Sequence, residues 1–185
     1  DLNTSLSYHL NIKKKKTILI DAHMDEIRGQ IINITSEGFL TVNILGGLVE
    51  YMHGRPIVIY SSKVNKLVKG VTLIQHAHLK QLRQKYKNEY NKEILYADIG
   101  AESKASAMTK VEIGDYLIFD YKYRYLNKDI ISARGLDNKL GVYVVIQLLT
   151  YFIKNITKLK YNLIISFSGD EESGKTSLSH LKKFK

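Results

Sequence analysis

Three consecutive carboxylates, Asp170, Glu171 and Glu172, are the side chains of this sequence best suited to carry out chemistry. They follow residues 163–167, an apolar run typical of a buried strand in a parallel sheet. Open α/β sheets bind their ligands at the carboxyl ends of their strands. Adjacent carboxylates repel each other unless a cation lies between them. The cluster therefore indicates a metal site with one carboxylate as ligand and another as general base, and a solvated acidic turn is the alternative.

The same stretch, Gly169 to Thr176, also matches the pattern of a phosphate-binding loop that follows a strand. Such a loop holds a polyanion with backbone N–H groups and a lysine, here Lys175. The three carboxylates inside the loop would lie beside a triphosphate. Two like charges ~4 Å apart cost roughly 4 kcal/mol at an effective dielectric of ~20. Nucleotide binding is therefore the weaker interpretation of this stretch.

A second group of metal-capable side chains follows residues 17–20, which are predicted to form a short buried strand. Residues two apart in an extended chain point the same way, so His23 can bind a metal while Asp25 orients it. A histidine in a polar turn with incidental acids is the alternative. Asp137 precedes an apolar pattern over residues 140–152 that is broad enough for a buried helix. An acid at that position is commonly a helix N-cap, and a role in the site is the alternative.

The segment between these groups has a different character, with short β-branched or alternating runs separated by turn residues. This pattern is typical of a small β-barrel or sandwich. The expected strands are residues 30–35, 39–45, 56–61, 67–75, 94–99, 116–121 and 130–131. A short helix is expected at 102–109, a helix or loop at 78–91, and the start of a helix at 175–185. The sequence thus predicts two α/β pieces with a β-rich block between them.

The composition is that of an ordinary globular protein, with 44% hydrophobic and 25% charged residues in a chain of 185. Cys is absent, which excludes disulfides and thiolate chemistry. No apolar run reaches the ~18 residues that span a bilayer, and no secretory signal opens the chain. We therefore expect no membrane partner and a cytoplasmic location. The net charge is +10, but the lysines are scattered and arginines are few, so we expect no nucleic-acid partner.

Four segments, taken in order along the chain, resemble one enzyme family. They are Ala-His-Met-Asp-Glu-Ile at residues 22–27, Asp-Ile-Gly-Ala at 98–101, Leu-Asp-Asn-Lys-Leu-Gly at 136–141 and Glu-Glu-Ser-Gly at 171–174. Their order and spacing resemble the co-catalytic metallo-aminopeptidases of the glutamyl aminopeptidase and tetrahedral aminopeptidase family. Some members of that family carry the label cellulase or endoglucanase. Lys139 departs from the pattern, because the family more often has Arg there.

The resemblance implies an α/β fold, with a phosphorylase/hydrolase-like catalytic domain, incomplete here, over residues 1–27 and 130–185. It implies that residues 28–129 form an inserted all-β barrel-like domain for homo-oligomer contacts. The implied activity is removal of N-terminal residues from short peptides with two divalent metal ions, zinc or cobalt. Residue by residue, it implies metal ligands at His23 and Glu172, a bridging ligand at Asp137, an orienting acid at Asp25 and a general base at Glu171.

The family's proteins are nearly twice as long as this chain. The resemblance therefore implies that an N-terminal helical part and a later Asp and His ligand lie outside these residues. Each ion would then have two of its three expected protein ligands. We expect weak metal binding or none, and negligible peptidase activity, from this chain alone. A non-catalytic assembly fragment is the main alternative. Glucan hydrolysis, suggested only by family labels, would need two carboxylates that flank a sugar.

The acidic interior of the apparent phosphate loop predicts that nucleotides do not bind. Isothermal titration calorimetry with ATP·Mg²⁺ should show no micromolar binding to the 185-residue chain. Micromolar binding that disappears in Lys175→Ala would show instead that Gly169 to Thr176 holds a phosphate.

Overall fold

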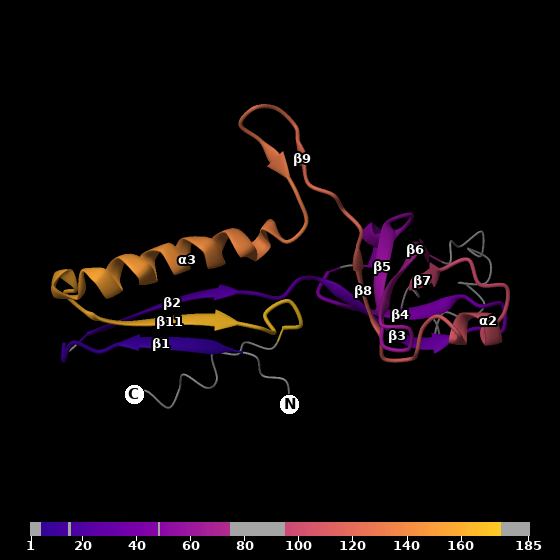
Figure 1. Ribbon diagram of the computed structural model, residues 1–185, viewed down its shortest axis with the longest axis horizontal. Helices are drawn as coiled ribbons and strands as arrows, with labels where there is room; N and C mark the ends of the chain where they lie inside the picture. The colour runs from indigo at the N-terminus through magenta and orange to yellow at the C-terminus, as the bar shows by residue number, and fades with distance from the viewer. Residues whose placement is uncertain (1–4, 15, 48, 75–94, 175–185) are drawn as a thin grey trace, which may run out of the picture. The chain divides into compact units, whose positions relative to one another are not determined.

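The computed structural model describes residues 5–14, 16–47, 49–74 and 95–174, and it divides into two compact units (Figure 1). The first unit comprises Asp1–Glu26 with Ala133–Lys185, and the second comprises Ile27–Ser132. The segments predicted at 78–91 and 175–185 lie outside the described residues. Among the described residues, no helix is both long enough and apolar enough to cross a membrane.

The first unit is built on a three-stranded mixed sheet with the strand order β1-β11-β2. The central strand β11 (Asn162–Ser168) runs parallel to β2 (Thr17–His23) and antiparallel to β1 (Leu6–Leu10). The parallel neighbour expected for the 163–167 run is therefore present on one side only. The sequence analysis did not predict β1. Leu6 and Tyr8 are each about half exposed, so no buried apolar face marks this strand.

Helix α3 (Leu136–Lys154) covers one face of this sheet and leads through the short helix η2 (Ile156–Lys158) into β11 (Figure 1). The core between helix and sheet comprises the buried residues Ala22, Val145, Leu149, Leu163, Ile165 and Phe167. The predicted buried helix is buried along a narrow stripe only, since Leu140 and Val144 are 61% and 48% exposed. A helix with apolar residues on several sides needs cover on each of them, and the described residues cover one.

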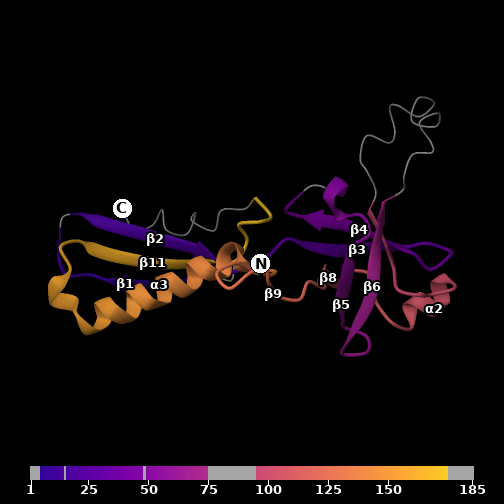
Figure 2. The same ribbon diagram turned by 90° about the horizontal axis from the view of Figure 1, so that it is seen from above.

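The second unit is a closed barrel with the strand order β3-β4-β7-β6-β5-β8, seen from above in Figure 2. Its strands are β3 (Arg28–Ile34), β4 (Leu40–Leu45), β5 (Pro56–Ser61), β6 (Lys66–Ile74), β7 (Leu95–Asp98) and β8 (Tyr116–Phe119). Every pairing in the barrel is antiparallel. The barrel predicted from the short β-forming runs is therefore present, and its closure leaves no free strand edge.

Inward-facing apolar side chains fill the barrel, and Ile31, Leu40, Ile59 and Leu117 are completely buried. The unit also contains the 3-10 helix η1 (Val49–Met52), the short helix α2 (Lys104–Met108) and a hairpin of β9 (Arg124–Tyr125) and β10 (Ile131–Ser132). α2 lies where the sequence predicted a helix. It begins at an N-cap serine, Ser103, whose side chain accepts the backbone N–H of Ser106.

Strands β6 and β7 approach each other closely at Gly70. A Cβ atom built there would lie 2.5 Å from the carbonyl oxygen of Asp98, a backbone atom that cannot move by a change of rotamer. The absence of a side chain at this position therefore allows the two strands to pair at their observed separation.

Gly70→Ala should destabilise the barrel unit by roughly 1–3 kcal/mol, because β6 must shift away from the Asp98 carbonyl. Urea unfolding followed by circular dichroism should show a lower midpoint. The control is Lys69→Ala at the neighbouring exposed position, which should change the stability by less than about 0.5 kcal/mol. If the two variants unfold at the same urea concentration, the close approach at Gly70 does not limit the barrel.

Candidate metal centre

The candidate site begins at the carboxyl end of β2, where His23 is the last residue of the strand and is buried. β2 extends three residues beyond the predicted 17–20 run, because β11 pairs with it as far as Ser168↔His23. The predicted burial of this run is wrong at its start, where Ile18 and Leu19 are 44% and 43% exposed. They lie on the edge strand of the sheet, and no neighbouring described strand covers them.

The acidic turn lies beside His23 because the parallel strands β11 and β2 end at the same edge of the sheet. Asp25 holds this turn. Its carboxylate accepts the backbone N–H of Glu171 at 3.2 Å and that of Glu172 at 3.1 Å. The side chain of Asp25 is only 6% exposed, and its Oδ1 lies 3.5 Å from Nδ1 of His23. One buried carboxylate thus restrains the turn and faces the imidazole.

The same hydrogen bonds argue against a phosphate-binding loop at Gly169 to Thr176. Such a loop directs its backbone N–H groups at a polyanion. Here the N–H groups of Glu171 and Glu172 are directed at the carboxylate of Asp25. The Lys175 and Thr176 positions of the pattern lie outside the described residues.

Asp137 reaches the site from the start of α3, and its Oδ1 lies 3.0 Å from Nε2 of His23. The N-cap interpretation of Asp137 is wrong. The cap position is occupied by Gly135, with φ +72°, and Asp137 lies inside the first turn with non-helical backbone angles of −89° and 107°. The carboxylate therefore points to His23 instead of closing the helix. Its side chain is 88% exposed, so it borders the open side of the site.

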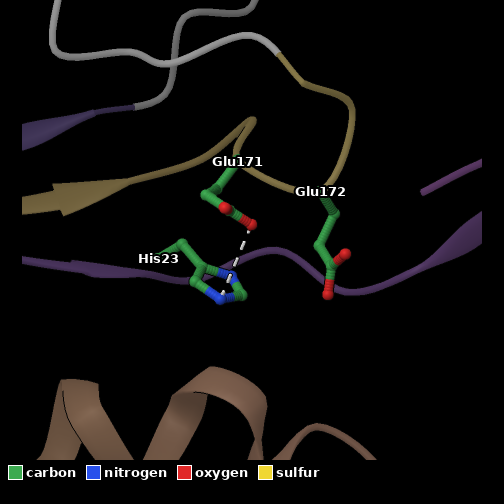
Figure 3. Close-up of side chains that lie close together, drawn as sticks. All are labelled: His23, Glu171 and Glu172. Atoms are coloured by element: carbon green, nitrogen blue, oxygen red, sulfur yellow. Dashed lines mark ion pairs between the residues drawn. The ribbon is translucent and has the colours of Figure 1, made fainter. Parts of the chain in front are cut away.

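His23, Glu171 and Glu172 each offer a ligand atom, and these atoms lie within 4.8 Å of one another. Figure 3 shows Glu171 extending from the turn after β11 toward the His23 ring on β2, with the side chain of Glu172 to one side of the ring. Oε2 of Glu171 lies 3.8 Å from Nε2 of His23. One imidazole nitrogen with several carboxylate oxygens is a set of donor atoms that zinc and similar divalent ions accept. The side chains present therefore fit a metal ion.

The electrostatics of the site are those of several carboxylates around one imidazole. Burial by itself lowers the pKa of His23, but the hydrogen bond to Asp137 and the charge of Glu171 outweigh it, so this pKa is raised above 6.5. Burial raises the pKa of Glu172; His23 opposes this shift and the charge of Glu171 adds to it. The carboxylates around His23 thus favour its protonated form, as they would favour a bound cation.

The sequence analysis assigned no role to Glu26, which follows Asp25 directly. Glu26 forms ion pairs with Nε of Arg134 at 2.9 Å and with Nζ of Lys139. This ion pair could have been suspected from the sequence, because Glu26 and Lys139 carry opposite charges and belong to the motifs at residues 22–27 and 136–141. Ser168 was also not predicted from the sequence; its hydroxyl donates a hydrogen bond of 2.9 Å to Asp21 and so links β11 to β2.

A family model described as M42 glutamyl aminopeptidase matches residues 5–182. The chain belongs to the M42 glutamyl aminopeptidase family. The resemblance inferred from the four motifs is therefore confirmed. A protein of Acetivibrio thermocellus named "Putative aminopeptidase" is 31% identical to this M42 chain over 163 residues, which are 87% of this chain and 44% of that protein.

Solved structures agree with the M42 assignment. The Pyrococcus horikoshii TET1 peptidase, which can assemble into a tetrahedron or a large octahedral shell, matches with a TM-score of 0.73 and 30% identity over 96% of this chain and 52% of its own. An endoglucanase from Thermotoga maritima matches with a TM-score of 0.64 over 98% of this chain and 51% of its own. At 23% identity, that match shows a shared fold alone. The chain spans about half the length of the relatives it matches.

Removal of the Asp137 carboxylate should lower the pKa of His23, because the hydrogen bond that stabilises its imidazolium is lost. A histidine NMR titration of the metal-free chain should give a His23 midpoint above 6.5 and a lower midpoint in Asp137→Asn. Because the folded-state pKa is raised, the stabilisation is fully present below pH 6.5 and is lost as the pH rises through the folded pKa.

The matched control for this titration is Asp129→Asn, whose side chain is 75% exposed in the barrel unit. It should leave the His23 midpoint unchanged. An unchanged midpoint in Asp137→Asn as well would contradict the hydrogen bond between Asp137 and His23.

Proposed function

We propose that this chain supplies part of the catalytic site of a metal-dependent aminopeptidase that removes N-terminal residues from short peptides. The supporting observation is the convergence of His23, Asp137, Glu171 and Glu172 at one edge of the sheet, in a chain of the M42 family. The two strands that carry the cluster end at this edge, where α/β folds place their ligands.

The residues that would hold two divalent ions, zinc or cobalt, are His23 through Nε2 and Asp137 and Glu172 through their carboxylates, and Asp137 would serve both ions. Nε2 is the nitrogen that faces Asp137 and Glu171, whereas Nδ1 faces the buried Asp25. Asp25 would then orient the imidazole by receiving the Nδ1 proton. When bound, the ions supply a Lewis acid for the scissile carbonyl and lower the pKa of water.

Glu171 is the proposed general base. Its side chain is 54% exposed, so water and a peptide can reach the carboxylate. Its backbone N–H is held by Asp25, which restrains the position of the side chain. In this role the carboxylate takes a proton from the attacking water and returns it to the leaving amine. Glu172 is less exposed than Glu171, and its raised pKa reflects burial that a bound cation would offset.

The proposed site is incomplete within the described residues. Zinc sites normally have three or four protein ligands, and the described residues offer about two for each of two ions. The chain also spans about half the length of its M42 relatives. We therefore propose weak, labile binding of Zn²⁺ or Co²⁺ by this chain and a requirement for further ligands from elsewhere.

Assembly is the second candidate function for the chain, as a homo-oligomer through the barrel unit. The barrel has its own closed core and carries none of the candidate site residues. It also exposes large apolar side chains that a partner would bury, including Tyr60 at 61% and Leu67 at 63%. The Pyrococcus horikoshii TET1 peptidase, which shares this fold, can itself assemble into closed shells.

Completion of the site should raise both metal binding and activity. Fusion of the part of the Acetivibrio thermocellus relative that follows its matched region should increase Co²⁺ affinity and release amino acids from short peptides. In this fusion, Glu171→Gln should lower hydrolysis by roughly 10²–10⁴-fold while the metal stays bound, because only the base is removed. Asp137→Ala should lose metal and activity together. Atomic absorption and chromatography of the released amino acids measure the two quantities.

Glu102→Gln, an exposed glutamate of the barrel unit, is the matched control and should change neither quantity. Full activity in both Glu171→Gln and Asp137→Ala would contradict the proposed roles. A fusion that binds metal but hydrolyses no peptide would favour assembly as the function of this chain.

A further inference from the structure

We infer that Glu26 is a positioning residue, which holds residues 134–139 so that Asp137 faces His23. Glu26 lies just beyond the end of β2, and its side chain is 19% exposed. Its Oε1 accepts a hydrogen bond from Nζ of Lys139, and its Oε2 lies 2.9 Å from Nε of Arg134. Within the described residues Oε2 accepts no hydrogen bond, so charge holds the contact with Arg134.

The two cations flank Asp137 along the chain. Arg134 stands three residues before it and Lys139 two residues after it. A single carboxylate that pairs with both cations therefore restrains the chain on each side of Asp137. His23, the hydrogen-bond partner of Asp137, lies three residues before Glu26 on the β2 side. Residues 23–26 thus contain both His23, which contacts Asp137, and Glu26, which holds the loop that carries Asp137.

Gly135 allows the loop to pass directly against this ion pair. A Cβ atom at Gly135 would lie 2.8 Å from Oε1 of Glu26 and 2.9 Å from Nζ of Lys139. The residue also has φ +72°, a backbone conformation that favours glycine. The absence of a side chain at Gly135 therefore leaves room for the contact between Glu26 and Lys139.

Asp137 needs this restraint because few neighbouring groups fix the position of its side chain. Its side chain is 88% exposed, and the backbone at Asp137 and Asn138 is not helical. Exposed ion pairs contribute little to global stability, and Lys139 and Arg134 are 52% and 36% exposed. The expected consequence of losing Glu26 is therefore a displaced Asp137 rather than an unfolded protein.

Glu26→Gln tests the inference, because it keeps the shape of the side chain and its ability to accept from Lys139 but removes the charge. In the metal-free chain, the ¹⁵N shift of His23 Nε2 should move toward its value in Asp137→Asn. Lys139→Met should produce the same change, and Lys139→Arg, which keeps the cation, should restore the wild-type shift. The urea midpoint should stay unchanged in all three variants.

A second measurement rests on the proposed function, since it uses Co²⁺ as the probe. Paramagnetic broadening of the His23 signals during a Co²⁺ titration should show an affinity reduced by roughly 10-fold in Glu26→Gln, as is typical when a group that orients a metal ligand is lost. The control is Glu112→Gln, which removes an exposed ion pair with Lys63 at 3.7 Å in the barrel unit. It should alter neither the His23 shift nor the affinity.

The two measurements separate the inference from the proposed function. No binding of Co²⁺ by the wild-type chain would contradict the weak metal binding proposed for it, and the metal-free His23 shift would still decide the role of Glu26. An unchanged His23 shift in both Glu26→Gln and Lys139→Met would overturn the inference. If Glu26→Gln fails to fold, Lys139→Met still tests the inference, because Lys139 is half exposed and its replacement is not expected to unfold the protein.

Discussion

The parallel pairing of β2 with β11 is the constraint on which the candidate site depends. Because the ladder continues to Ser168↔His23, the two strands end at the same edge of the sheet. The acidic turn that follows β11 then emerges beside the buried imidazole, and Asp25 can receive its backbone N–H groups. A shift of one residue in this register would turn His23 to the opposite face of the sheet and separate it from the carboxylates of the acidic turn. The position of the acidic turn beside His23 therefore depends first on the strand register, and only then on the chemistry of the side chains.

The cluster carries an excess of negative charge that the described residues only partly balance. His23 is the imidazole that Asp137 and Glu171 both approach, and its raised pKa shows that it holds its proton more tightly because of them. Burial favours the neutral form of Glu172 and raises its pKa, and the charge of Glu171 adds to this shift. A divalent cation relieves both effects at once, which is the physical reason that this arrangement suits a metal centre. Glu26 with its two cations compensates charge at the rim of the same site.

The two units differ in how completely they bury their apolar residues. The barrel closes on itself, and its core includes several fully buried side chains. The sheet of the other unit has described cover from α3 on one face, while Tyr143 and Ile153 of α3 are 60% and 57% exposed. A helix with apolar residues around much of its circumference is normally covered on several sides. The sheet unit, which carries the candidate ligands, is thus the unit whose apolar residues are less completely buried. The chain spans about half the length of the relatives it matches.

The strand runs of the barrel, the short helix α2, the family and a set of candidate ligands could be predicted from the sequence, because these predictions depend on local periodicity and on short motifs. The sequence could not reveal β1, whose apolar residues are half exposed, or the edge position of β2, because strand order is absent from local patterns. Only the tertiary structure decided that Asp137 contacts His23 instead of capping α3, and that Asp25 restrains the acidic turn. It also decided that Glu26 pairs with Arg134 and Lys139. Each of these contacts joins segments more than a hundred residues apart, which the pairing of β11 with β2 and the packing of α3 against β2 bring together.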